Sequence, residues 1–236
     1  YFLTEYTWSR EIPEKLIDVN IASDYSKIGN MLHLCKGEEK ENIISKTVAN
    51  EKITSEITEK FNPAIEFTEK DMISMLYYLG YLTISGEFLG KPQLVTPNKV
   101  MRDIYSSYFL EILKDKTQIK IEESMYNEIL EEIAIKGEIQ KVTELVRKYL
   151  KNLSNRDAVK FDEKYIKLIY YCITMNFNLY RVKSEMEVER KYPDLLLIPK
   201  QKEYYAVMIE FKYLKKEDKN KLEEKQNEAR KQIEEY

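Results

Sequence analysis

Residues 192–215, YPDLLLIPKQKEYYAVMIEFKYLK, decide the fold of the C-terminal part of the chain. DLLLIP (194–199) and YYAVMIEFKYL (204–214) are apolar and aromatic segments typical of β-strands, and PKQKE between them predicts a turn. LYRVKSEMEV (179–188) predicts a preceding strand. Apolar residues recur at helical spacing over 161–177, and a polar helix is expected after Asp218. The predicted order is helix, three strands, helix.

Charged residues interrupt these strands at one end. Residues two apart share a face of a strand. One side of the third strand is therefore expected to carry Ala206, Met208, Glu210 and Lys212, and the other, apolar side Tyr205, Val207, Ile209, Phe211 and Tyr213. Charges are costly to bury unless they are paired. If the last two strands form a hairpin, Asp194 lies opposite the end of the third strand, close to Glu210, and Glu187 of the first strand could join them.

Carboxylates that are brought together repel one another unless a cation lies between them. Oxygen ligands suit Mg²⁺ or Mn²⁺, and such an ion with a nearby ammonium group is suited to phosphodiester hydrolysis. A salt bridge at the sheet end, with Asp194 as a turn residue, explains the spacing equally well. Glu-x-Lys alone has little specificity, because Glu223 and Lys225 also match it.

The N-terminal part, 1–115, is predicted to be mostly helical with one hairpin. Thr68 and Asp71 form a capping-box pattern, Gly80 ends that helix, a hairpin follows at 81–96, and Thr96 is the expected N-cap of the next helix. Helix, hairpin, helix is a winged-helix-like outline, and the absence of a notably basic helix favours a scaffold. Residues 116–157 predict a helical linker broken at Gly137.

Composition excludes several classes of protein. The 236 residues are 43% hydrophobic and 33% charged, which indicates a globular protein, and the net charge of −3 argues against a basic nucleic-acid platform without excluding a nuclease. With one histidine, zinc sites and histidine triads are not expected. GEFLGKP (86–92) lacks the spacing of a phosphate-binding loop, so we expect no nucleotide site here. Without an apolar run of 18 residues or a secretion signal, and with two cysteines expected to be reduced, we predict a cytoplasmic protein with no membrane segment.

Pro193-Asp194 and Glu210-Phe211-Lys212, within helix–strand–strand–strand–helix, resemble the PD-(D/E)xK nuclease superfamily. The resemblance implies an α+β or α/β protein in which 158–236 form a C-terminally incomplete, restriction-endonuclease-like α-β-β-β-α core. It makes Asp194 and Glu210 metal ligands, Lys212 the catalytic lysine and Glu187 a further ligand.

Two other residues are implied as accessory positions. Gln232 matches a glutamine that recurs in the helix after the lysine strand, although a solvated helix residue is an equally good interpretation. Glu163 is a distant candidate, because many nucleases of this superfamily take an acid from the preceding helix.

The chain also resembles a bacterial family with an AAA-type ATPase domain followed by a nuclease-like domain. YRVKSEMEV, AVMIEFKYL and EARKQIEEY are similar to its nuclease-like part, and MLYYLGYLTI with TPNKVMRDIY to the segment before that part. The resemblance implies an N-terminal ATPase domain in cis, missing from this sequence, and a nucleic-acid substrate, DNA. VERKYP (188–193) departs from the Gly-rich, Arg-bearing turn of the family. A non-catalytic module that keeps the nuclease fold for binding or regulation is the alternative.

Overall fold

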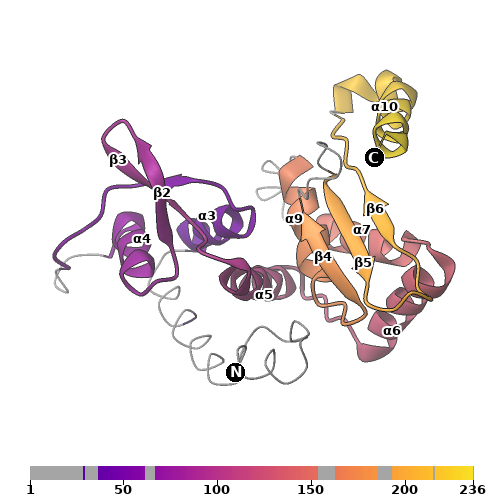
Figure 1. The fold of residues 1–236 in the computed structure, drawn as a ribbon, viewed down its shortest axis with the longest axis horizontal. Coiled ribbons are helices and arrows are strands. Elements are labelled where there is room, and N and C mark those ends of the chain that lie inside the picture. The colour runs from indigo at the N-terminus through magenta and orange to yellow at the C-terminus, as the bar shows by residue number, and fades with distance from the viewer. Residues whose placement is uncertain are drawn as a thin grey trace. The chain divides into compact units, whose positions relative to one another are not determined.

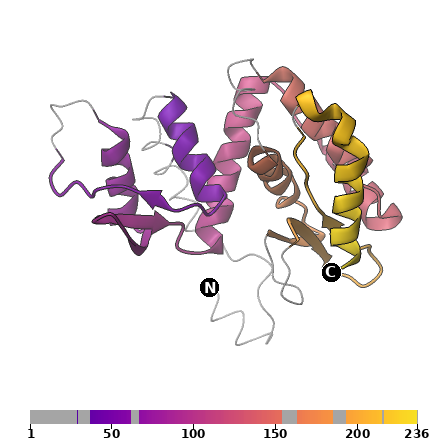
Figure 2. The same cartoon turned by 90° about the horizontal axis from the view of Figure 1, so that it is seen from above.

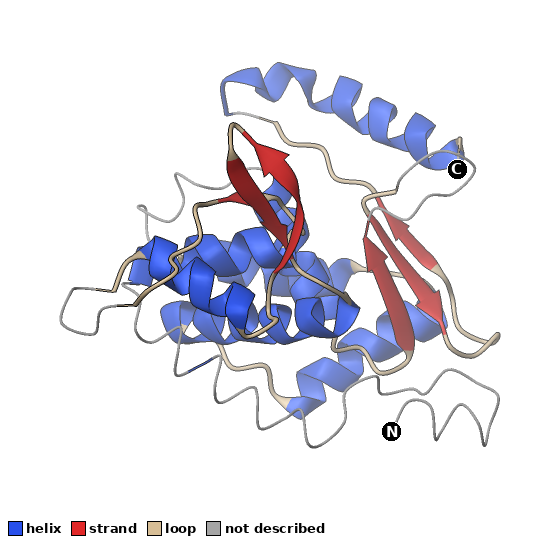
Figure 3. Cartoon of the chain, turned by 60° about the vertical axis from the view of Figure 1, so that its left-hand side comes forward, coloured by secondary structure: helices blue, strands red, loops and turns tan. Residues whose placement is uncertain are grey.

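The computed structural model describes residues 29, 37–61, 67–153, 163–184, 193–214 and 216–235. The chain divides into two compact units, Tyr1–Phe109 and Leu110–Tyr236, with the boundary inside helix α5 (Lys99–Thr117). Each unit has helices and one small antiparallel sheet, so the predicted mixed α and β fold class is confirmed (Figure 1, Figure 3). In the described residues, no helix is both long and apolar enough to cross a membrane.

The N-terminal unit combines helices with the predicted hairpin. Its elements are α3 (Gly37–Val48), β1 (Ile53–Thr54), α4 (Glu69–Tyr78), β2 (Thr83–Phe88), β3 (Lys91–Val95) and the first part of α5. The strands lie in the order β1-β3-β2, and both neighbouring pairs are antiparallel (Figure 2). Leu89 and Gly90 have φ angles of 51° and 75°, which suit the tight turn of a two-residue hairpin.

Two predicted helix boundaries of this unit have different outcomes. The capping box is confirmed, since the Thr68 side chain accepts the N–H of Asp71 and the Asp71 carboxylate accepts that of Thr68. The N-cap predicted at Thr96 is wrong. The Asn98 side chain instead accepts the Met101 N–H at 3.0 Å. The buried Thr96 hydroxyl donates to the Thr47 carbonyl at 2.7 Å, which satisfies a group that could not remain unpaired in the core.

The C-terminal unit carries the predicted helix–strand–strand–strand–helix order. Its elements are α6 (Glu123–Glu131), the π-helix η2 (Glu132–Lys136), α7 (Gln140–Asn152), α9 (Glu163–Thr174), β4 (Tyr180–Ser184), β5 (Leu195–Pro199), β6 (Val207–Ile209), the 3₁₀ helix η3 (Lys216–Lys221) and α10 (Leu222–Glu234). The strands are antiparallel in the order β4-β5-β6, as expected for a hairpin of the last two. Helix α9 packs on β4 and β5, and α7 packs on α9 (Figure 1).

The face of the third strand predicted to be apolar is buried only in its middle, because Tyr205 and Tyr213 are 56% and 42% exposed. Leu195 and Leu197 are fully buried, and Val207 and Ile209 are also buried, whereas Met208 between them is partly exposed. The third strand is shorter than predicted, because β6 ends at Ile209 and Glu210 and Lys212 follow it in extended coil.

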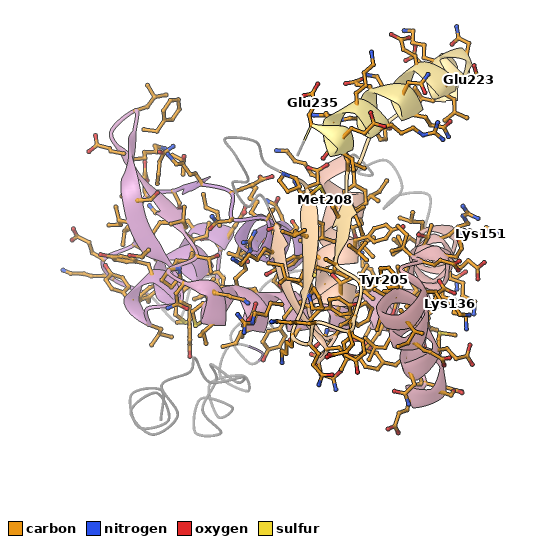
Figure 4. The ribbon with its side chains drawn as sticks, turned by 45° about the vertical axis from the view of Figure 1, so that its right-hand side comes forward. Lys136, Lys151, Tyr205, Met208, Glu223 and Glu235 are labelled. Carbon is orange, nitrogen blue, oxygen red and sulfur yellow. The ribbon has the colours of Figure 1, made fainter. Side chains whose placement is uncertain are left out.

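The helical pair α6–α7 docks at the β5–β6 loop. Gly137 has a φ of 70° and ends η2, which confirms the predicted break, and the buried Glu132 accepts the Lys141 N–H at 2.7 Å near the start of α7. The Tyr205 N–H donates to the Ala134 carbonyl at 3.1 Å, and Tyr205 lies beside the turn that carries Lys136 (Figure 4).

We expect Gly137→Ala to lower the free energy of unfolding by about 1–3 kcal/mol, because the φ is left-handed. An added Cβ would also lie 3.1 Å from the Tyr205 ring. Urea unfolding followed by circular dichroism measures the loss. In a Tyr205→Ala background the contact is removed, so the glycine substitution should cost less there. An equal cost in both backgrounds would show that the ring contact contributes nothing.

Candidate functional site

Asp194 stands immediately before β5 and is held by two other segments. Its Oδ1 accepts the Lys167 ammonium of α9 at 2.7 Å, and its Oδ2 accepts the Phe211 N–H beyond β6 at 2.8 Å. The Lys167 and Asp194 side chains are 18% and 16% exposed, so the pair is shielded from solvent on most sides. These two contacts compensate the aspartate charge at the end of an apolar strand.

Glu210 lies across the sheet end from Asp194. The register pairs Leu195 with Ile209, and one further step places Asp194 opposite Glu210. The Glu210 side chain is only 5% exposed, and its Oε1 accepts the Lys212 ammonium at 2.8 Å. In the part of the chain that the structure describes, Glu210 Oε2 is buried and has no hydrogen-bond partner. A buried carboxylate oxygen in this state has unused capacity for a cation or a donor.

Lys212 is influenced by both carboxylates. Burial by itself would lower the pKa of Lys212, but the hydrogen bond and charge of Glu210, together with the charges of Glu228 and Asp194, outweigh burial and raise that pKa above its usual value. Lys212 is therefore an ammonium at neutral pH, and it lies at the same sheet end as Asp194 and Glu210.

The flanking helices bring accessory residues to this end of the sheet. Glu163 Oε2 accepts the Tyr213 N–H at 3.0 Å, so α9 also contacts the segment after β6 directly. Glu228 of α10 acts on Lys212 through its charge, and Gln232 follows one helical turn later. Among the described residues, Gln232 Oε1 is buried without a hydrogen-bond partner. Glu187 lies outside the described residues.

The donor chemistry fits a hard divalent cation. Asp194 and Glu210 offer carboxylate oxygens, which Mg²⁺ and Mn²⁺ prefer, and Glu210 Oε2 is the oxygen that lacks a partner. Within the described ranges, no three His, Cys, Asp or Glu side chains form a metal-binding group. The fit therefore rests on two carboxylates and on the orphaned oxygen.

One comparison with known families gives a match to part of the chain. Residues 161–236 match the family model of the PD-(D/E)XK nuclease superfamily. The matched segment includes α9, the β4–β6 sheet and α10, and thus contains each site residue named above, whereas α6 and α7 precede it. No curated protein and no solved structure matches the chain.

Lys167 is the residue of the site that sequence analysis missed. It lies four residues after Glu163, so the two share a face of α9, and both contact segments at the end of the sheet. This spacing was the one signal in the sequence that could have identified Lys167. It is weak, because a lysine on an amphipathic helix is ordinarily solvated. Only the fold shows that its ammonium is directed to Asp194.

We expect Lys167→Met to lower the free energy of unfolding in chelator by about 1–3 kcal/mol, since it leaves a largely buried carboxylate without its cation. Added Mn²⁺ should narrow the difference from wild type, because a cation at Asp194 replaces the lost charge. Urea unfolding with and without Mn²⁺ tests both effects. The control is Lys183→Met on the exposed side of β4. A loss no larger than that of the control would contradict a structural role for this ion pair.

Lys212→Met should lower stability at neutral pH, because Glu210 then loses the cation at its carboxylate. The folded-state pKa of Lys212 is raised, so its contribution is complete below the ordinary lysine value of 10.5 and is lost as pH rises through the folded value. The stability difference between wild type and variant should stay constant from about pH 6 to pH 9 and shrink only above about pH 10.5. Urea midpoints measured across this range check it, and a difference that shrinks near pH 8 would show that Lys212 is not held as an ammonium.

Proposed function

We propose that residues 158–236 of the C-terminal unit form a metal-dependent nuclease domain that hydrolyses phosphodiester bonds, with DNA as its substrate. The observation that carries the proposal is the gathering of Asp194, Glu210 and Lys212 at one sheet end, inside the segment that matches a nuclease superfamily. The orphaned Glu210 Oε2 supports it, because a buried anionic oxygen without a partner is costly in a purely structural role.

Each residue has a distinct role in this proposal. Asp194 and Glu210 hold Mg²⁺ or Mn²⁺, with Glu187 as a further ligand. When bound, such an ion polarises the phosphodiester and lowers the pKa of a bound water. Lys212 stays protonated, so it neither ligates a metal nor accepts a proton, and it stabilises the negative charge that develops on the phosphate.

Glu163 and Gln232 act around this centre. Glu163 positions the segment that carries Lys212, because it accepts the N–H of the next residue, Tyr213. Gln232 is proposed to contact the substrate backbone through its side-chain amide, and its buried, unpartnered Oε1 supports a polar contact at this point.

We further propose that the nuclease acts in a bacterial protein with an ATPase domain in cis. The resemblance of the segments around α4 and α5 to an ATPase–nuclease family supports this part. The order α4, β2–β3 hairpin, α5 in the N-terminal unit is compatible with the winged-helix-like connection expected there.

A non-catalytic module that keeps the nuclease fold is the alternative. One observation favours it: Asp194 and Glu210 are each already paired with a lysine, Lys167 and Lys212 respectively. Such pairs stabilise a sheet end without any metal, and in that case the site would be a structural remnant.

A plasmid-nicking assay with the full-length protein distinguishes the nuclease proposal from the non-catalytic alternative. Asp194→Asn and Glu210→Gln should abolish Mn²⁺-dependent cleavage, whereas Lys212→Ala should lower the rate by about 10²–10³, as is typical when one charge-stabilising group is lost. Mn²⁺ affinity, measured by calorimetry, should fall for the two carboxylate variants and change little for Lys212→Ala. Lys202→Ala, in the exposed β5–β6 turn, is the matched control.

Two outcomes contradict the proposal. Equal cleavage by wild type and all variants would identify a contaminating nuclease. No cleavage by wild type with metal, nucleotide and plasmid present would favour the non-catalytic alternative.

A further inference from the structure

Helix α7 carries a basic stripe that the proposed site does not use. Its buried side holds Val142, Leu145, Val146 and Tyr149. On another side are Lys141, Glu144, Arg147, Lys148 and Lys151, which are spaced by three residues except for the adjacent pair Arg147 and Lys148. The stripe runs for about 15 Å at the usual helical rise. Lys151 marks its C-terminal end and points away from the sheet (Figure 4).

The stripe borders a groove between α6 and α7. The groove has a volume of about 440 Å³ and is lined by Met125, Ile129 and Leu145 together with charged residues. Those charged residues are four basic and two acidic side chains, Lys141, Arg147, Lys148, Lys151, Glu128 and Glu144. A groove with an excess of positive charge contrasts with the chain, whose net charge is −3.

The cations of the groove are not all neutralised. Lys141 pairs with Glu128 at 2.7 Å, so these two charges offset one another. Arg147, Lys148 and Lys151 are exposed, and no ion pair links any of them to a carboxylate in the part of the chain that the structure describes. Three neighbouring cations on one rigid helix repel one another, which a bound polyanion would relieve.

The groove lies next to the candidate site through a continuous set of packed residues. Burial raises the pKa of Tyr170 in α9. The hydrogen bond from Tyr170 to Thr143 of α7 and the charge of Arg147 partly offset that rise. Arg147 therefore lies near the Tyr170 hydroxyl. The Tyr170 and Phe211 ring centroids are 5.0 Å apart, and the Phe211 N–H holds Asp194. The packed side chains between α7 and α9 therefore connect the groove to the candidate site.

We propose that the α6–α7 groove binds the phosphodiester backbone of nucleic acid outside the cleavage site, through Arg147, Lys148 and Lys151. The inference rests on the proposed function in taking nucleic acid as the substrate. Regularly spaced phosphates complement cations that recur at three to four residues along a helix, and the apolar floor can contact sugars. Glu144 lies within the stripe and opposes the bound phosphates, so it limits affinity.

Fluorescence anisotropy of a labelled DNA duplex and of its single strand, in chelator, measures binding without cleavage. Lys148→Ala/Lys151→Ala should weaken binding roughly ten-fold per lysine near 0.1 M salt and reduce the slope of log K against log salt by about two. Glu144→Gln should tighten binding. The matched control is Lys136→Ala/Lys202→Ala, with the same loss of charge at exposed positions outside the groove. Circular dichroism verifies folding of each variant.

Each outcome decides the proposal. Weaker binding in the groove variant alone, with a lower salt slope, supports it, and the duplex and single-strand arms identify the form that binds. An equal loss of DNA affinity in the control variant, or no loss of affinity in either variant, would overturn it. Equal binding of a poly-glutamate peptide of matched charge would also overturn it, in favour of an acidic protein partner. If nucleic-acid binding depends on the groove but the protein cleaves no plasmid, the nuclease proposal fails while the proposal of a nucleic-acid-binding groove stands.

Discussion

The hydrogen bond from the Phe211 N–H to the Asp194 carboxylate is the interaction on which the site depends. It ends the β5–β6 ladder, since the N–H donates to a side chain and no longer to a strand. It also places the backbone between Glu210 and Lys212 against Asp194, so two carboxylates and a lysine meet without a long strand. Because Lys167 contacts the other oxygen of Asp194, one side chain fixes β5, α9 and the chain after β6.

Helix α9 connects this centre to the rest of the C-terminal unit. One side of it packs on β4 and β5, while Glu163 and Lys167 extend to the end of the sheet. Helix α7 packs on α9, and the Tyr170 hydroxyl donates to Thr143 across that contact. The helical pair is anchored again where the Tyr205 N–H meets the Ala134 carbonyl. A basic surface on α7 is therefore held rigidly near the sheet end although its sequence lies outside the family match.

The sequence was informative where the pattern and the physical requirement coincide. Alternation predicted the buried positions Val207 and Ile209, and the expected hairpin predicted that Asp194 lies opposite Glu210. Prediction from the sequence failed where a side chain took the place of a backbone group in a hydrogen bond. The apolar run through Phe211 predicts a longer strand, because propensity cannot show that an aspartate 17 residues earlier takes its N–H. Thr96 likewise has the composition of an N-cap, yet its hydroxyl is used by a carbonyl 49 residues away. Local patterns could not identify these distant partners, and Lys167 was missed for the same reason.

The charges at this sheet end bear on the proposed metal site. Two lysines and two carboxylates neutralise one another at the sheet end, so a divalent cation would add positive charge where Lys167 and Lys212 already lie. In the proposed nuclease, a bound metal ion would therefore repel these ammonium groups toward any anion nearby. In that proposal, a substrate phosphate would be such an anion. Metal and phosphate should for this reason bind with positive coupling, each lowering the electrostatic cost of the other. The orphaned Glu210 Oε2 fits this proposal, since one buried carboxylate oxygen has no partner among the described residues while Oε1 accepts the Lys212 ammonium.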